Sequence, residues 1–314
     1  MSNITTVAVL PPAVREYYDR LLLMTAYPQL VHTKFAQKRI LPEKMGDTIV
    51  FRRYSRLSTV PIPLQDGITP PGTPLSVTDI KARVDFYGNF VTITNQVELT
   101  VEDRVLNESA RLLAQNLAQT MDEVTRDVLA STASVQACSN GVNGNTPTEL
   151  TKADIDSAVQ TLLGNNAEMI SEVVVGTNAF GTAPVRPSFW AYISTGLLDD
   201  LESVSNFIHS ANYPNQQSVL DAEWGATGNV RWLYTSVGSV SSATPAVYNN
   251  FVIGREAYAV VHLGSETGQF YIEPLGSAGS ADPLHQRGSV GWQHPFVSRI
   301  LNDAFLVNLI STHS

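Results

Sequence analysis

The sequence contains a single cysteine, Cys138, among 314 residues. A disulfide within the chain needs two cysteines and a cysteine-rich metal centre needs several, so both are excluded. This scarcity is typical of a protein made in a reducing cytosol. Cys138 could alternatively be a nucleophile, but the sequence favours a structural role.

Charge is also scarce: charged residues make up 16% of the chain, and the formal net charge is -9. Nucleic-acid affinity comes chiefly from Lys and Arg side chains that displace counterions, so this balance disfavours a dedicated DNA-binding protein. A lightly charged surface instead indicates burial against partners. The hydrophobic content of 43% is that of an ordinary globular protein, and the length predicts two compact regions with separate cores.

Long apolar runs are missing as well. No segment is apolar over a length that could span a bilayer, and the first ten residues have neither a basic start nor the apolar core of a signal peptide. We therefore expect a soluble chain that starts in the cytoplasm and has no membrane segment.

The motifs of known enzyme classes are absent from the sequence: the phosphate-binding loop, the dinucleotide fingerprint, the Gly-x-Ser-x-Gly elbow and the His-Glu-x-x-His helix. The six histidines are scattered, and His285 and His294 lie too far apart for a standard ligand pair. Gly264 interrupts any helix that would bring His262 and Glu266 together, so His262 is predicted to be structural. Helix capping explains the paired carboxylates, which are Glu102, Asp103, Asp199 and Asp200.

The first part of the chain predicts an arm and then a projecting hairpin. Residues 14–27 carry apolar side chains at helical spacing and predict an amphipathic helix on an N-terminal arm. A turn at Gly46 leads into a β-rich segment, residues 48–54, and a second strand is predicted over residues 80–94, with a bulge or bend at Gly88. At roughly 3.3 Å per residue the second strand is longer than a small core can cover, so we expect the hairpin to reach a neighbouring subunit.

A proline-rich loop separates these two strands. Regular structure is largely excluded there by five prolines, which are Pro61, Pro63, Pro70, Pro71 and Pro74. A structureless loop of this length inside a compact domain is unusual unless it works outside the domain, and we infer that it does.

Two helices carry recognisable start signals. The capping box from Thr100 to Asp103 opens a long helix in which Asp122 and Arg126 stand at the spacing of an ion pair. Its predicted apolar stripe is Leu106, Ala110, Leu113, Leu117, Met121, Val124 and Val128. A second capping box at Thr151 predicts a helix that ends at Gly164.

The remaining segments predict an α+β protein. We expect a helix over residues 188–201 and exposed loops at residues 239–244 and 276–282. The predicted strands cover residues 172–175, 229–236, 251–263 and 269–272. Core packing is the predicted role of the four tryptophans, which are Trp190, Trp224, Trp232 and Trp292.

The basic cluster of Arg52, Arg53 and Arg56 leaves three alternatives open. These side chains could contact DNA, pair with carboxylates of an adjacent subunit, or line a solvated strand edge. Isolated surface charges contribute little on average, which favours the third.

In their order along the chain, several segments resemble the major capsid proteins of tailed bacteriophages, in particular those of N4-like podophages. The most specific segment is residues 282–292, with the sequence DPLHQRGSVGW. The other segments that carry the resemblance are residues 33–39, 46–54, 63–67, 87–94, 99–100, 125–129, 223–225, 230–232, 254–258 and 300–302.

The resemblance implies the Hong Kong 97-type phage coat fold, an α+β fold with an N-arm, an extended E-loop, a peripheral P-domain with a spine helix, and an axial A-domain. It divides the chain into an N-terminal arm (1–45), the E-loop hairpin (46–95), the P-domain with its spine helix (96–150), mainly the A-domain (151–281) and a return segment of the P-domain (282–314).

The implied function is that of a major capsid protein that self-assembles as hexamers and pentamers into an icosahedral shell around double-stranded DNA. Implied partners are further copies of the chain, a separate scaffolding protein, portal and cement proteins, and weak non-specific contact with packaged DNA. We expect a virion protein assembled in the host bacterial cytoplasm, with no catalytic, cofactor-binding or metal residue. The candidate intersubunit residues are Arg52, Arg53, Arg56, Val60, Ile62, Leu64 and Ile68.

Two other functions stay open from the sequence. A nanocompartment shell of the same fold would enclose protein cargo in place of DNA. An enzyme with a novel motif would need a convergent set of polar residues, and the sequence shows none.

Overall fold

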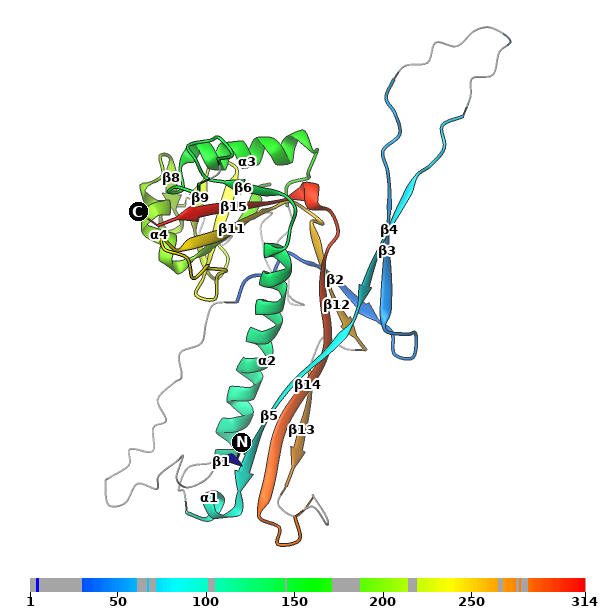
Figure 1. Ribbon diagram of the computed structural model, residues 1–314, viewed down its shortest axis with the longest axis vertical. Helices are drawn as coiled ribbons and strands as arrows, with labels where there is room; N and C mark the ends of the chain where they lie inside the picture. The colour runs from blue at the N-terminus through cyan, green and yellow to red at the C-terminus, as the bar shows by residue number, and fades with distance from the viewer. Residues whose placement is uncertain are drawn as a thin grey trace.

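The computed structural model describes residues 4–5, 30–60, 67, 72–100, 105–144, 146–170, 187–213, 219–264, 268–274, 277 and 282–313. These residues form two mixed regions, each built around a sheet, and a two-stranded hairpin that leaves the body (Figure 1). The mixture of long helices with antiparallel and parallel strands is the expected α+β class.

The first region is a seven-stranded sheet with helices on one face. Helices α3 (Lys152–Gly164) and α4 (Leu198–Ser203) pack against that face, while short 3-10 turns connect the strands. In spatial order the strands are β6 (Val135–Ala137), β15 (Leu306–Thr312), β11 (Val247–Ile253), β7 (Phe189–Ser194), β10 (Val230–Thr235), β9 (Glu223–Thr227) and β8 (Phe207–His209).

Helix α3 begins where the sequence predicted. The Thr151 side chain accepts a hydrogen bond from the Asp154 backbone, and the Asp154 carboxylate accepts one from the Thr151 backbone. This capping box satisfies two backbone donors that a helix start leaves unpaired. Ile155 and Leu162 then face the sheet and are buried in its core.

The second region is a six-stranded sheet with a long helix along one face. Helix α2 (Val105–Ala130) lies beside the central strand β14, and α1 (Asn95–Thr100) precedes it (Figure 1). The strands run in the order β1 (Ile4–Thr5), β5 (Asp85–Thr94), β14 (Arg287–Ile300), β12 (Tyr258–Leu263) and β2 (Gln37–Leu41), with β13 (Gln269–Glu273) also on β14. Leu113 of α2 packs with Val290 and Trp292 of β14, which confirms the inward stripe at that point.

A buried polar network joins the two regions. Asp122 of α2 accepts hydrogen bonds from the backbone and the ring of His32, at 2.8 and 2.7 Å. The Tyr258 hydroxyl donates to the His32 carbonyl and lies 2.9 Å from the Tyr192 hydroxyl of β7. Buried polar groups need such partners, and here the partners come from both sheets and from α2.

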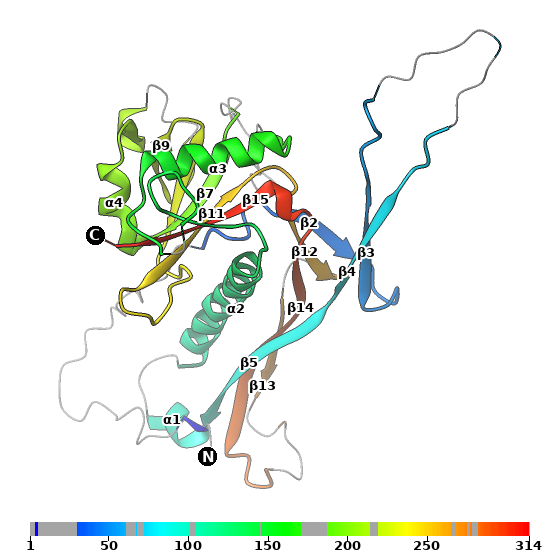
Figure 2. The ribbon, with the colours of Figure 1, turned by 45° about the horizontal axis from the view of Figure 1, so that its top comes forward.

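The hairpin consists of β3 (Thr48–Tyr54) and β4 (Val77–Arg83), which pair antiparallel and form a sheet of their own. Its base packs through Ile49 and Phe51 against a small core around Val261. Figures 1 and 2 both show it extending well away from the two sheets, which confirms a projecting hairpin.

The helix predicted over residues 188–201 is wrong, because residues 189–194 form strand β7 and only residues 198–203 form an α-helix. All six residues of β7 are buried. Phe189 and Ala191 enter the core under α3, while Trp190 and Tyr192 enter the core on the other face. A strand covered on both faces has no polar alternation, so its sequence resembles a buried helix.

Two predicted strands are each divided in the structure. The strand expected over residues 251–263 is interrupted by a turn in which Glu256 has a φ of 57°, so β11 and β12 belong to different sheets. The strand expected over residues 80–94 divides at Val84, since β4 stays in the hairpin and β5 pairs with β14.

Of the bulge or bend predicted at Gly88, the bulge is absent, because β5 keeps one register along β14, with Gly88 opposite Gln293. A Cβ at residue 88 would lie 2.9 Å from the Trp292 carbonyl oxygen, so glycine permits the close approach of the two strands. The ion pair expected between Asp122 and Arg126 is also wrong. Asp122 binds His32, and Arg126 binds Asp127 and the Val237 carbonyl.

Three predictions lie outside the described residues: the arm helix of residues 14–27, the strand of residues 172–175, and residues 101–103 of the first capping box. The strands 229–236 and 269–272 are confirmed as β10 and β13. No helix in the described part of the chain is long and apolar enough to cross a membrane.

Candidate assembly interface

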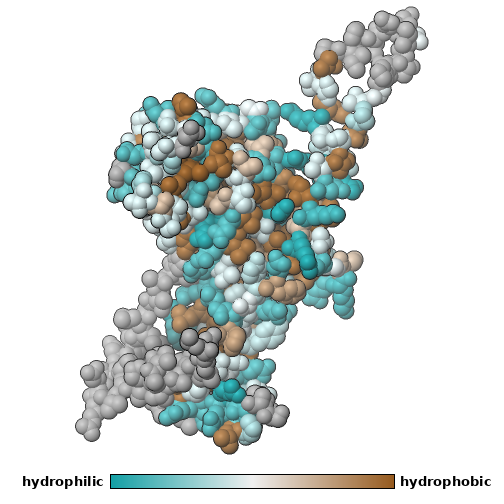
Figure 3. Space-filling model, in the orientation of Figure 1, coloured by the Kyte–Doolittle hydropathy of each residue, from teal (hydrophilic) through white to brown (hydrophobic). Residues whose placement is uncertain are grey.

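The hairpin presents apolar side chains without a core beneath them. Tyr54, Leu57 and Leu75 are exposed, and the side chain of Val60 is 72% exposed. Figure 3 shows apolar residues at intervals along the hairpin. A soluble monomer gains nothing by exposing several large hydrophobic residues in one place, so this segment has the character of a docking element.

The three arginines of the predicted cluster have different surroundings. The Arg52 guanidinium binds Asp79 across the hairpin, with 3.0 Å from Nε to the carboxylate, and Arg53 donates to the Leu301 carbonyl at 3.5 Å. Arg56 is exposed on the segment that follows β3. The Arg52 interaction lowers the pKa of Asp79 by hydrogen bonding, although solvent screens so exposed a pair.

The other candidate contact residues fall between β3 and β4 in the sequence. Val60 is described and exposed. Ile62, Leu64 and Ile68 lie outside the described residues.

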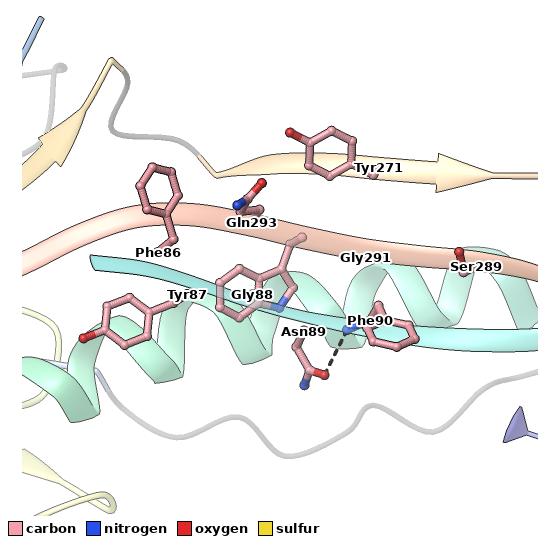
Figure 4. A pocket seen from close by; sticks show the side chains of 10 residues that line it. Phe86, Tyr87, Gly88, Asn89, Phe90, Tyr271, Ser289, Gly291 and Gln293 are labelled. Atoms are coloured by element: carbon pink, nitrogen blue, oxygen red, sulfur yellow. Dashed lines mark hydrogen bonds between the residues drawn. The ribbon is translucent and has the colours of Figure 1, made fainter. Parts of the chain in front are cut away.

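A shallow groove lies on the six-stranded sheet. It encloses about 330 Å³ between β5, β14 and β13, on the face of the sheet turned away from α2 (Figure 4). Phe86 and Phe90 stand over it with 61% and 62% of their surface exposed, and Tyr271 adds a third ring. Gly88 and Gly291 form its floor.

The glycine floor has a steric cause. A Cβ at residue 291 would come within 2.9 Å of the Phe90 Cβ, so only glycine allows this ring to sit over β14. The result is an open, aromatic-walled trough whose floor is backbone. Such a surface can accept an extended peptide segment from another molecule.

The remaining reactive groups include the single cysteine and the carboxylates of α4. Cys138 is fully buried, and burial raises the pKa of its thiol to about 12, so the nucleophilic thiolate is disfavoured. Asp199 and Asp200 lie in the first turn of α4, and Asp200 pairs with His313 at 2.8 Å. Within the described ranges, no three His, Cys, Asp or Glu side chains are grouped to hold a metal ion.

Sequence reasoning missed a histidine pair. His262 of β12 and His294 of β14 are both buried, and their ring nitrogens lie 2.8 Å apart. Burial, the neighbouring His294 and then Lys38 lower the pKa of His262 to about 4, and burial lowers the pKa of His294. The pairing depends on the register of two strands that are 32 residues apart in sequence, which no local pattern reveals.

The tryptophans have the predicted role: Trp190, Trp232 and Trp292 are buried in cores, and Trp224 packs at the edge of one. The exposed apolar side chains described above lie instead on the hairpin and on the peripheral strands of the six-stranded sheet.

The fold agrees with those of solved phage heads. The capsid of Ralstonia phage GP4 matches with a TM-score of 0.68 at 13% identity, over 99% of this chain and 98% of that chain. The head of Helicobacter pylori bacteriophage KHP40 matches with a TM-score of 0.65 at 14% identity, over 100% and 98%. The capsid of Cyanophage P-SCSP1u gives 0.64 at 13% identity, over 96% and 94%.

At these identities the likeness establishes the fold, which is the Hong Kong 97-type phage coat fold. No curated protein sequence matches the chain significantly. A family of phage capsid proteins matches residues 77–294, which include most of both sheets and helices α1 to α4. The chain therefore belongs to the phage capsid protein family.

Proposed function

We propose that the chain assembles as hexamers and pentamers into an icosahedral shell that encloses phage double-stranded DNA. Its family makes it a major capsid protein that forms the shell, and a nanocompartment that holds protein cargo is not favoured. The observation that carries the proposal is the projecting hairpin, which has exposed apolar side chains and extends well away from the two sheets.

The mechanism of assembly is geometric. Contacts of modest size become cooperative when they close symmetric rings and shells, so no single contact has to be strong. A lightly charged surface with scattered apolar residues suits such an assembly, because every subunit brings the same apolar patches to its contacts with its neighbours.

The groove on the six-stranded sheet is a candidate receptor for a hairpin tip. The tip sequence contains Pro71 and Pro74 at P-x-x-P spacing and the aliphatic Val60, Ile62, Leu64 and Ile68. Aromatic-lined grooves recognise proline-rich segments because the ordering cost of such segments is low. In Figure 1 strands β3 and β4 lead away from β5, β13 and β14, which line the groove, so the tip that binds belongs to another subunit.

The division into arm, E-loop hairpin, P-domain, A-domain and return segment is part of this proposal. The seven-stranded sheet with α3 and α4 would be the body of the A-domain, and α2 would be the spine helix of the P-domain. Two strands of that sheet come from outside residues 151–281: β6 from the segment 96–150 and β15 from the return segment 282–314. The return segment supplies β14, on which β5 lies at the base of the hairpin.

Further parts of the proposal concern relatives and partners. We assign the chain to the N4-like podophage group on the ordered segments of its sequence. We expect assembly in the host bacterial cytoplasm with a separate scaffolding protein, portal and cement proteins, and weak non-specific contacts with packaged DNA through side chains such as Arg56.

Negative-stain electron microscopy of the purified protein, alone and with its scaffolding protein, tests the proposal. We expect rings, tubes or shells, and a strictly monomeric species at all salt and crowding conditions would contradict it.

Phe90→Ser tests the groove. The Phe90 ring is mostly exposed, so the subunit should fold normally while the yield of shells falls. Ile40→Ser, which removes an exposed side chain from β2, serves as the matched control.

A further inference from the structure

Strand β13 forms an open edge of the six-stranded sheet. All five of its residues are exposed, including Phe270, Tyr271 and Ile272 at 44%, 47% and 56%. Among the described residues β13 has a strand neighbour, β14, on one side only. An exposed apolar edge strand offers unpaired backbone donors and acceptors, and it is a template for association with another strand.

The backbone hydrogen bonds of β14 reveal which groups of β13 are free. The backbone N–H of Asn95 donates to the Gln286 carbonyl. The backbone N–H and C=O groups of the even-numbered residues of β14 therefore point toward β5, and those of the odd-numbered residues point toward β13. The Leu301 N–H donates to the Ala257 carbonyl next to β12, which lies on the same side of β14 as β13. This bond also directs the backbone groups of odd-numbered residues to that side. Because Gly291 is opposite Tyr271, the N–H and C=O groups of residues 270 and 272 point to the open side.

We propose that β13 pairs antiparallel with β13 of a second copy around a two-fold axis at Tyr271, joining the two sheets. The second copy is a neighbouring subunit, so the inference rests on the proposed shell. In this register Phe270 and Ile272 of each copy exchange backbone hydrogen bonds with Ile272 and Phe270 of the other. Gln269 then lies opposite Glu273 of the second copy, which avoids two like charges facing each other.

Other registers that use the same free groups pair fewer residues. A shift by two in one direction places Ile272 opposite itself and Phe270 opposite Pro274, which has no N–H to donate. The opposite shift places Phe270 opposite itself and Glu273 beyond the partner strand. Only the register centred on Tyr271 pairs all five residues, and it is self-complementary as a two-fold contact requires.

The side chains are arranged for the same pairing. Gln269, Tyr271 and Glu273 share one face of the strand, since side chains alternate. The Tyr271 hydroxyl donates to Gln269 Oε1 at 2.6 Å, which orients the amide so that its nitrogen can donate to the Glu273 carboxylate of the second copy. On the other face the Phe270 ring lies beside Ile272 of the second copy, an aromatic–aliphatic cross-strand pair.

Disulfide cross-linking in assembled particles tests the contact and its register. Facing residues at the centre would be a non-hydrogen-bonded pair, with Cα atoms about 4.5 Å apart, within the range of about 4.4–6.8 Å that a disulfide spans. Tyr271→Cys should therefore give a covalent dimer on a non-reducing gel after mild oxidation. Phe270→Cys is the matched control and should stay monomeric, since it faces Ile272 of the second copy. The native Cys138 is buried and does not compete.

Well-formed particles of Tyr271→Cys without dimers would overturn the proposal, as would dimers of Phe270→Cys alone. If the parent forms no particles at all, the shell function itself has failed, which is a separate result.

A charge exchange tests the same contact without removing the tyrosine ring. Gln269→Glu puts two carboxylates opposite each other at both ends of the pairing, and should lower the shell yield severalfold at a fixed protein concentration. Adding Glu273→Gln to that variant recreates the original complementarity in reverse and should restore the yield. Equal yields for the parent, the single variant and the double variant would overturn the pairing.

Discussion

Strands β7 and β13 show how differently the two regions of the subunit are completed. Every residue of β7 is buried, because helices and sheet residues of the same chain cover both of its faces. Every residue of β13 is exposed, and the hairpin is largely exposed as well. The seven-stranded region is completed by its own chain, whereas on our proposal neighbouring subunits complete the peripheral region. The proposal therefore expects stability and assembly to depend on different residues, so that substitutions separate them.

The largest effect on unfolding is expected in the self-completed region. Trp232→Ala removes a fully buried side chain from the core under α3 and should cost about 3–5 kcal/mol, measured by urea unfolding. Phe86→Ala, in an exposed position on β5, should cost less than about 1 kcal/mol. Equal losses at the two positions would remove the distinction between the regions.

A smaller loss of unfolding free energy is expected on helix α2. Leu117 packs toward β14 and lies so close to β13 that a Cβ at Gly268 would meet its Cδ2 at 2.6 Å. Leu117→Asp should cost about 3 kcal/mol by placing a carboxylate there. Leu112→Asp, on the exposed side of the same helix, is the matched control and should leave the melting temperature and circular dichroism nearly unchanged.

Acid should weaken the subunit through the histidine pair. The pKa of His262 falls from 6.5 to about 4 on folding, so the unfolded chain binds more protons between these values. The stabilisation is present above pH 6.5 and is lost as the pH falls toward 4, by on the order of 2 kcal/mol. Urea unfolding at pH 7 and pH 5 measures the change. In His262→Gln the free energy of unfolding should change less between pH 7 and pH 5. An unchanged difference would show that the histidine pair does not take up protons on unfolding.

The smallest effect on stability is expected for the hairpin tip, although its effect on assembly should be complete. Replacing residues 59–75 by a short Gly/Ser turn keeps β3, β4 and the hydrogen bond from Ser55 to the Ser76 carbonyl. The entropic cost of closing a loop changes slowly with its length, so the free energy of unfolding should change by less than about 0.5 kcal/mol. No closed shells should form. A Gly/Ser tip of the original length separates chemistry from reach. Normal particles from either variant would contradict the projecting-contact model.

Local signals in the sequence predicted the parts of the fold that local forces determine. The capping box at Thr151 sets the start of α3 through neighbours three residues away. The prolines between β3 and β4 predicted a loop, and the described residues 55–60 and 72–76 have no regular structure. The resemblance to phage coat proteins supplied the overall fold. Strand β7 was mistaken for a helix, because its burial on both faces depends on partners distant in sequence.

The candidate interface was predictable only in part. The hairpin and its exposed Val60 follow from sequence, but the groove does not, since it requires Phe86, Phe90 and Tyr271 to meet across three strands. The same is true of Asp122, whose spacing to Arg126 suggested a helix pair while the fold brings His32 to it instead. Contacts set by strand register or by tertiary approach leave no local pattern.

The direct passage from β4 into β5 has a mechanical consequence. A single residue, Val84, separates the hairpin from a strand that pairs with β14 along its whole length, and Figure 1 shows the two as one continuous path. Tension applied to the hairpin by a neighbouring subunit runs along the axis of β5. The backbone hydrogen bonds between β5 and β14 are then loaded in shear. They resist the force together, and they do not break one after another from one end. A head under internal pressure would thus pull against the strongest direction of its peripheral sheet.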